Sequence, residues 1–147
     1  MIPSITLWEA YLIESLRSKG MDNKSLPRFI EKSDIKALND FDHTFDHTEL
    51  IVTNNSTSIK LAIEANYKVK FISINGIKNL MGMKFGLKEG KDFQMTETNF
   101  HDVSLSNEQM KILHTMISPL WLMVNVRSEL SNNIVDIVHS AEAIVNS

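Results

Sequence analysis

The chain has 147 residues, of which 43% are hydrophobic and 22% are charged, and it contains no cysteine. This composition is typical of a globular protein and excludes a disordered chain, while the lack of cysteine excludes a disulfide scaffold, a thiolate zinc site and a cysteine nucleophile. We expect a single globular domain over residues 1–147 in a cytoplasmic setting, with neither a secretion signal nor a membrane span.

The net charge of −3 is unevenly distributed along the chain. Residues 60–91 hold seven lysines and two glutamates, a local balance of +5. Residues 34–49 hold five carboxylates and one lysine, a local balance of −4. A chain polarised in this way can steer a charged partner toward one of its regions.

A first helix is predicted over residues 6–19. Thr6 and Glu9 fit a capping box, in which the two side chains satisfy backbone N–H groups at the helix start. Gly20 follows where a helix commonly ends in the left-handed conformation. Three apolar side chains recur at helical spacing and are expected to be buried together: Trp8, Leu12 and Leu16.

The next elements are expected to include a parallel pair of strands. A second helix is predicted over 25–39, with a break at Ser33 and Asp34. The apolar run 50–53 is predicted to be a buried strand, and a helix that ends at Asn66 follows it. Residues 67–73 alternate long polar and apolar side chains, which indicates a half-exposed strand. Two strands separated by a helix favour a parallel, right-handed unit.

The second half of the chain begins with weaker signals. Residues 75–85 are compatible with a helix, although glycines interrupt the region, and 93–98 are compatible with a third strand. Ser106 and Gln109 form a second capping box, which predicts a helix over 107–117.

The C-terminal region completes the predicted fold. Residues 120–126 fit either a strand or a helix, and a last helix is predicted over 133–145. The fold class is therefore α+β, with helices at both ends packed around a small central sheet of about three strands.

A tandem Phe-Asp-His-Thr repeat over residues 41–48 is the most unusual motif. With the glutamate that follows, it gathers side chains of the types that bind zinc, manganese or iron: Asp42, His43, Asp46, His47 and Glu49. A helical turn would place both imidazoles on one face. The alternative is an acidic loop whose Asp and Thr side chains close Asx turns above the two phenylalanines. Spacing alone is a weak signal, so we favour the loop and expect no metal or other cofactor.

Six lysines in the positively charged region are candidate contacts for phosphate groups: Lys68, Lys70, Lys78, Lys84, Lys88 and Lys91. The region has no arginine, the residue that most often contacts base edges, and the chain as a whole is acidic. A solvated surface would have the same composition, so nucleic-acid binding is an alternative hypothesis.

The predicted last helix carries two adjacent apolar rows. The residues concerned are Ile134, Val138, Ala141 and Val145 in one row and Ile137 and Ile144 in the other. Such a face either covers the core of its own domain or docks against a second copy or another protein.

No coherent set of catalytic residues emerges from these patterns. We therefore expect a small non-enzymatic regulatory or inhibitory protein that acts by binding another protein, with self-association as a further possibility. A nucleic-acid-binding regulator that uses residues 60–91 is the first alternative. A metal-dependent enzyme centred on the 42–49 loop is the second.

Overall fold

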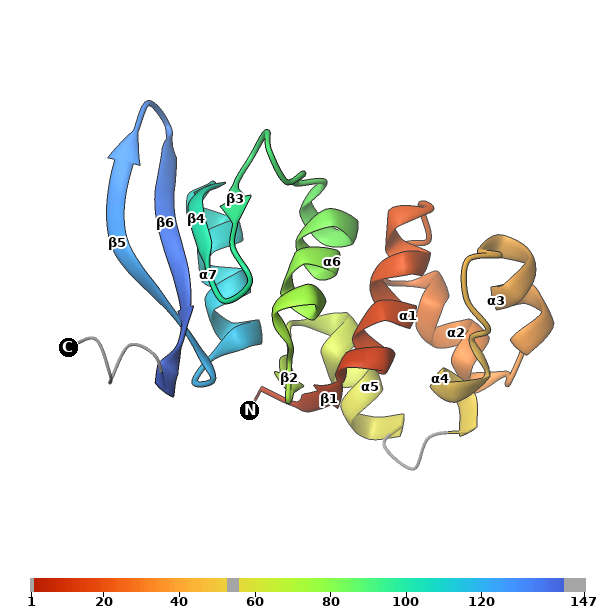
Figure 1. Cartoon of the computed structure of the whole chain (residues 1–147). Helices are drawn as coiled ribbons and strands as arrows, with labels where there is room; N and C mark the ends of the chain where they lie inside the picture. The colour runs from red at the N-terminus through yellow and green to blue at the C-terminus, as the bar shows by residue number, and fades with distance from the viewer. Residues whose placement is uncertain (1, 53–55, 142–147) are drawn as a thin grey trace. The chain divides into compact units, whose positions relative to one another are not determined.

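A computed structural model describes residues 2–52 and 56–141 of the chain. Within these ranges the protein has seven helices and six strands (Figure 1). The mixture of helix and strand agrees with the predicted class, but the predicted layout of one sheet between terminal helices is only partly matched. The chain divides into two compact units, Met1–Lys70 and Phe71–Ser147, which we call the N-terminal and C-terminal units. In the described residues no helix is both long enough and apolar enough to cross a membrane.

The N-terminal unit combines helices with a two-stranded parallel sheet. Its elements are β1 (Ser4–Thr6), α1 (Leu7–Ser18), α2 (Ser25–Glu31), α3 (Ile35–Phe41), α4 (Thr48–Val52), α5 (Ser56–Glu64) and β2 (Lys68–Lys70). β1 pairs with β2, and Ile5 lies opposite Val69. Both of these side chains are buried, so the small sheet contributes to the core of the unit.

Helix α1 confirms the predicted capping box. The Thr6 hydroxyl accepts from the Glu9 N–H at 3.1 Å, and Glu9 Oε1 accepts from the Thr6 N–H at 2.8 Å. Leu12 and Leu16 are fully buried, as expected, but Trp8 is 43% exposed. The prediction was wrong for Trp8, since this side chain lies in the first turn of the helix and its ring packs on an aromatic loop residue.

The break in the second predicted helix is confirmed. Ser33 adopts a left-handed conformation with φ of 54°, and Asp34 caps α3 by accepting the Ala37 N–H at 3.1 Å. The left-handed Ser33 therefore interrupts the helix after α2, and the Asp34 side chain supplies a hydrogen-bond acceptor for the first turn of α3.

The predicted strand over residues 50–53 is wrong, because Leu50 and Ile51 belong to helix α4 and residue 53 lies outside the described residues. Asp46 Oδ1 accepts the Thr48 N–H at 3.1 Å where this helix begins. A short apolar run suits a buried helix as well as a buried strand. The parallel partner of β2 is β1, a strand that was not predicted from the sequence.

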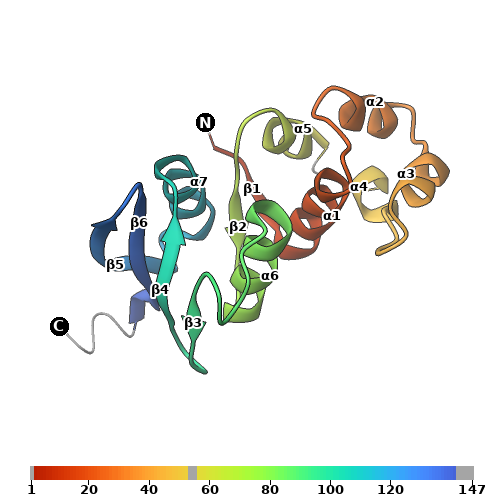
Figure 2. The same cartoon turned by 90° about the horizontal axis from the view of Figure 1, so that it is seen from above.

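The C-terminal unit contains a four-stranded antiparallel sheet. Its elements are α6 (Ile74–Phe85), β3 (Gln94–Met95), β4 (Phe100–Leu105), α7 (Asn107–Ile117), β5 (Trp121–Glu129) and β6 (Asn132–His139). The strand order is β3-β4-β6-β5. Helix α7 contacts β4, β5 and β6, and it lies beside the sheet in both views (Figures 1 and 2). The capping box of Ser106 and Gln109 is present, as predicted.

The predicted C-terminal helix is wrong, because its first half forms β6. Ile134, Ile137 and Val138 lie on this strand, Ala141 follows it, and residues 144 and 145 (Ile144 and Val145) lie outside the described residues. Val135 and Ile137 are buried and alternate with partly exposed neighbours, which is the period of a strand. Consecutive β-branched residues favour strands, and they also matched a helical spacing by coincidence.

Strand β4 was missed because a bulge interrupts its alternation. The pairing register with β6 shifts between Phe100 and Val103, and Asp102 there has a φ of 56°. Phe100, Val103 and Leu105 are all buried, a spacing that fits neither a regular strand nor a helix. Of the ambiguous region 120–126, residues 121–126 belong to β5, which carries a second bulge between Val124 and Arg127.

Candidate protein-interaction site

One face of α1 carries Trp8, Tyr11 and Ser15. These positions are separated by three and four residues, so they follow one another along the same side of the helix. The segment between α3 and α4, residues 42–47, lies along this side. Phe45 contacts the two aromatic rings, and Asp42 contacts Ser15.

Trp8, Tyr11 and Phe45 form a cluster that we call the aromatic face. The Trp8 ring meets Phe45 edge to face at a centroid distance of 5.2 Å, and it meets Tyr11 in the same way at 6.5 Å. The rings of Tyr11 and Phe45 are nearly parallel, 6.3 Å apart. Trp8 is 43% exposed and the other two are half-buried. The cluster therefore presents an ordered apolar surface to solvent.

A polar cluster of Ser15, Asn39, Asp42 and His47 holds the 42–47 segment against α1. The Ser15 hydroxyl donates to Asp42 Oδ2, and His47 Nε2 lies 3.2 Å from the same oxygen. The side chains of Asp42 and His47 have no exposed surface. Asp42 Oδ1 also accepts the Thr44 N–H at 3.0 Å, which closes the turn that leads to the aromatic residue.

Asn39 fixes the orientation of the His47 ring. Its Oδ1 accepts the backbone N–H of His47 at 2.8 Å and lies 2.9 Å from the ring atom Nδ1. A backbone N–H always donates, so the Asn39 amide oxygen faces His47 and accepts from Nδ1 when that ring nitrogen carries the proton. Burial lowers the pKa of His47, and the charges of Asp42 and Asp46 oppose this effect.

The Asp42 carboxylate remains ionised well below neutral pH. Burial acts to raise its pKa, but hydrogen bonds from Ser15 and Thr44 and the nearby His47 hold the pKa below its ordinary value of 3.8. The polar cluster thus places a carboxylate that accepts hydrogen bonds from Ser15 and Thr44 directly after the end of α3.

The five residues considered as metal ligands do not come together. Asp42 and His47 belong to the buried polar cluster, whereas His43, Asp46 and Glu49 are exposed. Residues 42–47 are not helical, so the two imidazoles do not share a helix face. Across 2–52 and 56–141, no group of three or more potential ligands is arranged to hold a metal ion. The Asx turns expected for an acidic loop are present, since Asp46 Oδ1 also accepts from Thr48.

The six candidate lysines are distributed over both units. Lys68 and Lys70 lie on β2 of the N-terminal unit, and the other four belong to the C-terminal unit. Lys78 forms an ion pair with Glu89 at 3.3 Å. Phosphate binding by these lysines remains a prediction.

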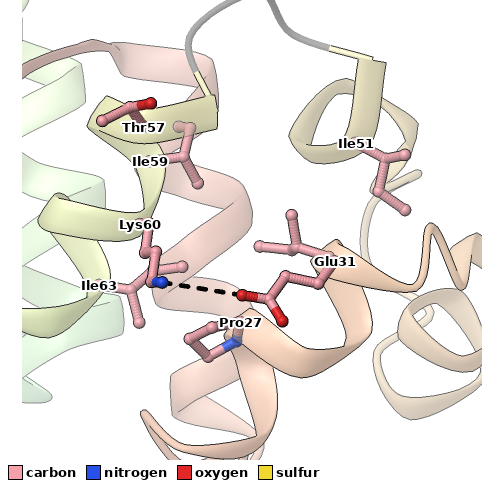
Figure 3. A pocket seen from close by; sticks show the side chains of 8 residues that line it. Pro27, Glu31, Ile51, Thr57, Ile59, Lys60 and Ile63 are labelled. Atoms are coloured by element: carbon pink, nitrogen blue, oxygen red, sulfur yellow. Dashed lines mark ion pairs between the residues drawn. The ribbon is translucent and has the colours of Figure 1, made fainter.

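An apolar pocket lies between α2, α4 and α5 and encloses about 310 Å³ (Figure 3). Isoleucines and a proline supply most of its wall: Pro27, Ile30, Ile51, Ile59 and Ile63. Lys60 Nζ and Glu31 Oε1 form an ion pair of 3.7 Å at its edge, and Thr57 also lines it. Both charged side chains are more than half exposed, so their pairing stabilises the unit little.

A second carboxylate-centred network lies on the sheet of the C-terminal unit. Asp136 accepts the Asp102 N–H at 3.0 Å and the Asn125 side-chain amide at 2.8 Å. Arg127 donates to Asp102 and lies 3.8 Å from Asp136. Partial burial acts to raise the pKa of Asp136, but these hydrogen bonds and the Arg127 charge hold it below the ordinary value. The network connects the bulges of β4 and β5, where Asp102 and Asn125 have positive φ angles.

Comparison of the chain with family models, curated proteins and solved structures gave no match. The aromatic face was not identified from the sequence, where Trp8 was assigned to the core. Its signal was present as a row of Trp8, Tyr11 and Ser15 beside the aliphatic row of Leu12 and Leu16.

Proposed function

We propose that the protein is a small non-enzymatic regulatory protein that acts by binding another protein through the aromatic face. The observation that carries the proposal is the exposed Trp8 ring, held in edge-to-face contact with Tyr11 and Phe45. Trp and Tyr are enriched among the residues that contribute most to the affinity of protein interfaces. A cluster of such rings on a solvent-exposed surface is suited to form the centre of a protein interface.

The polar cluster supports this role because it orders the surface before any partner arrives. A loop that must be fixed on binding loses conformational freedom, and that loss weakens the complex. In this chain the Asp42 carboxylate and the Asn39 amide already hold the segment that carries Phe45. Binding therefore requires little further ordering of the chain.

The same contacts favour binding over hydrolytic chemistry. Ser15, Asp42 and His47 are the types of residue found in a nucleophilic triad, but the Ser15 hydroxyl donates to Asp42. A nucleophilic serine instead needs its hydrogen bond to the imidazole base. All three side chains are also buried, so a substrate has no access to them.

We place this activity in the cytoplasm, in keeping with a chain that has no cysteine. The partner is a different protein, and a second copy of the chain is the alternative. Self-association through a C-terminal apolar helix is not proposed, because Ile134, Ile137 and Val138 lie on β6.

Photo-crosslinking tests the proposal directly. Trp8 is replaced by benzoylphenylalanine in one protein, and Phe71, which is 90% exposed in the C-terminal unit, is replaced in a matched control. In a lysate of the source cells, we expect a discrete adduct from position 8 that unlabelled wild type displaces and Trp8→Ala does not. Equal adducts from both positions, or displacement by Trp8→Ala, would contradict the proposal.

A further inference from the structure

The aromatic face lies in a part of the chain that has no basic side chains. Its three rings come from two segments, residues 2–16 and 37–52, and neither segment contains a lysine or an arginine. The second segment contains four carboxylates, of which Asp40, Asp46 and Glu49 are exposed. The formally charged side chains within these two segments are therefore all carboxylates.

Asp46 is the exposed carboxylate next to Phe45 in the chain. Hydrogen bonds from the hydroxyl and N–H of Thr48, and from the Asn39 amide, lower its pKa. It consequently carries a full negative charge at neutral pH. The same contacts hold the Asp46 carboxylate in place at the position that follows Phe45 in the chain.

Exposed aromatic rings and carboxylates share one preferred ligand type. The face of an indole or phenol ring attracts a cation, and arginine does so most often in proteins. Carboxylates attract the same group by charge and by paired hydrogen bonds. Phosphates of a nucleic acid and anionic lipid headgroups are repelled by the same surface.

We infer that the partner bound at the aromatic face presents a basic segment, with an arginine or lysine side chain lying on the Trp8 ring and its neighbours paired to Asp46 and Glu49. This inference rests on the proposed protein-binding function and adds the chemistry of the partner. The cationic contact on the ring contributes about twofold to fivefold in affinity. The carboxylates chiefly accelerate association and make binding sensitive to salt.

The test uses acetyl-tetraarginine amide as the probe and acetyl-tetraglutamine amide as its neutral counterpart. The indole N–H signals of the ¹⁵N-labelled protein report binding, because the chain has two tryptophans in different environments. Trp121 is buried and its indole N–H donates to the Ile72 carbonyl at 2.9 Å, so its signal serves as an internal reference. We expect a saturable shift of the Trp8 signal with the arginine peptide alone.

Charge and ring contributions are then separated by substitution. Asp46→Asn/Glu49→Gln should weaken peptide binding about threefold or more, while Glu31→Gln/Glu64→Gln, with the same charge change on α2 and α5, should not. Phe45→Leu should weaken binding about twofold to fivefold with an unchanged far-ultraviolet circular dichroism spectrum. Raising NaCl from about 0.05 M to about 0.5 M should weaken binding further.

Three results would overturn the inference. The first is a Trp8 shift with the glutamine peptide equal to that with the arginine peptide. The second is a loss of affinity in Glu31→Gln/Glu64→Gln equal to that in Asp46→Asn/Glu49→Gln. The third is the absence of a Trp8 shift at millimolar concentrations of the arginine peptide. The proposed function fails separately, when crosslinking at position 8 gives no specific adduct. A Trp8-dependent adduct that is insensitive to salt and to Asp46→Asn/Glu49→Gln would retain the protein-binding function and reject the basic partner.

Discussion

Asp42 and Asp136 each hold irregular backbone in place, yet their surroundings differ. Asp42 is fully buried, and its hydrogen bond with Ser15, 27 positions earlier in the sequence, joins the 42–47 segment to α1. Asp136 retains some exposed surface and connects two bulges on neighbouring strands of one sheet. A buried donor without an acceptor is costly, whereas water replaces a lost partner near the surface. We therefore expect Asp42 to stabilise the N-terminal unit more than Asp136 stabilises the C-terminal unit.

Truncation of a buried apolar side chain in α1 should cause the largest loss of stability, with which the two carboxylate substitutions can be compared. Leu12 is fully buried, so Leu12→Ala removes packed atoms and leaves a cavity. We expect a loss of about 2–5 kcal/mol in the free energy of unfolding, measured by denaturant titration. A loss smaller than about 0.5 kcal/mol, the size typical of a surface substitution, would mean that α1 is not part of the core.

Removal of the buried carboxylate should have the next largest effect. Asp42→Ala leaves the Ser15 hydroxyl without its acceptor and opens space beside His47. We expect a loss of about 2–3 kcal/mol in the free energy of unfolding. Because Phe45 depends on the same loop, the Trp8 fluorescence should shift as well. Asp42→Asn retains an acceptor and should cost less, so equal losses would show that hydrogen bonding is not the cause.

The corresponding change at the sheet should cost less. Asp136→Ala removes the acceptor of the Asp102 N–H and the Asn125 amide, both in exposed residues. Water can reach these donors, so we expect a loss of about 1 kcal/mol or less. Denaturant titration of both alanine variants gives the comparison directly. A loss as large as that of Asp42→Ala would show that the bulges, and not burial, set the cost.

The two networks should also respond differently to acid. The pKa of His47 is lower in the folded state than its ordinary value of 6.5, so the unfolded chain binds more protons as the pH falls. The stability contributed by neutral His47 is present above the unfolded pKa and is lost as the pH falls through the folded pKa. Asp136 has a pKa below 3.8, so its contribution is lost only at lower pH.

Denaturant midpoints at about pH 7.5 and about pH 5.5 bracket the ordinary pKa of histidine. We expect the wild type to lose stability between them and His47→Gln to lose less. Asp136 cannot cause this change, because its pKa lies below 3.8 and therefore outside the pH range measured. A slope that is unchanged in His47→Gln would assign the acid sensitivity to other groups.

The smallest effect is expected from the lysines, which were considered as phosphate contacts. Lys68→Gln/Lys70→Gln alters the N-terminal unit and Lys84→Gln/Lys88→Gln alters the C-terminal unit. If a nucleic acid binds, neutralising the lysine pair that contacts it should reduce the salt slope of binding, the change in log affinity with log salt concentration, by about two. A gel shift titration in both variants measures this. Because the chain as a whole is acidic, we expect no binding near physiological salt.

Local hydrogen-bonding signals were predicted well from the sequence. Thr6 and Glu9, Ser106 and Gln109, and the break at Asp34 all act within three or four residues, so the sequence contains the whole interaction. Their side chains compete with backbone groups for the same hydrogen bonds, which fixes helix starts independently of distant contacts.

The remaining errors come from partners that are distant in sequence. Residues 133–139 contain β-branched residues at several positions, and the pairing of β6 with β5 and β4 decided between strand and helix. Positive φ angles at Asp102 and Asn125 introduced bulges that spacing rules do not anticipate. The contact between Ser15 and Asp42 likewise depends on tertiary structure, so the site could be predicted only as two separate segments.

The two tryptophans also provide a means to ask whether the chain unfolds in one step. Trp8 belongs to the N-terminal unit and is partly in water, whereas Trp121 belongs to the C-terminal unit and is 6% exposed. Trp121→Phe leaves a tryptophan in the first unit alone, and Trp8→Phe leaves one in the second alone. Coincident melting curves from the two proteins would indicate that the units are thermodynamically coupled, and separate curves would show two cooperative transitions in a chain of 147 residues.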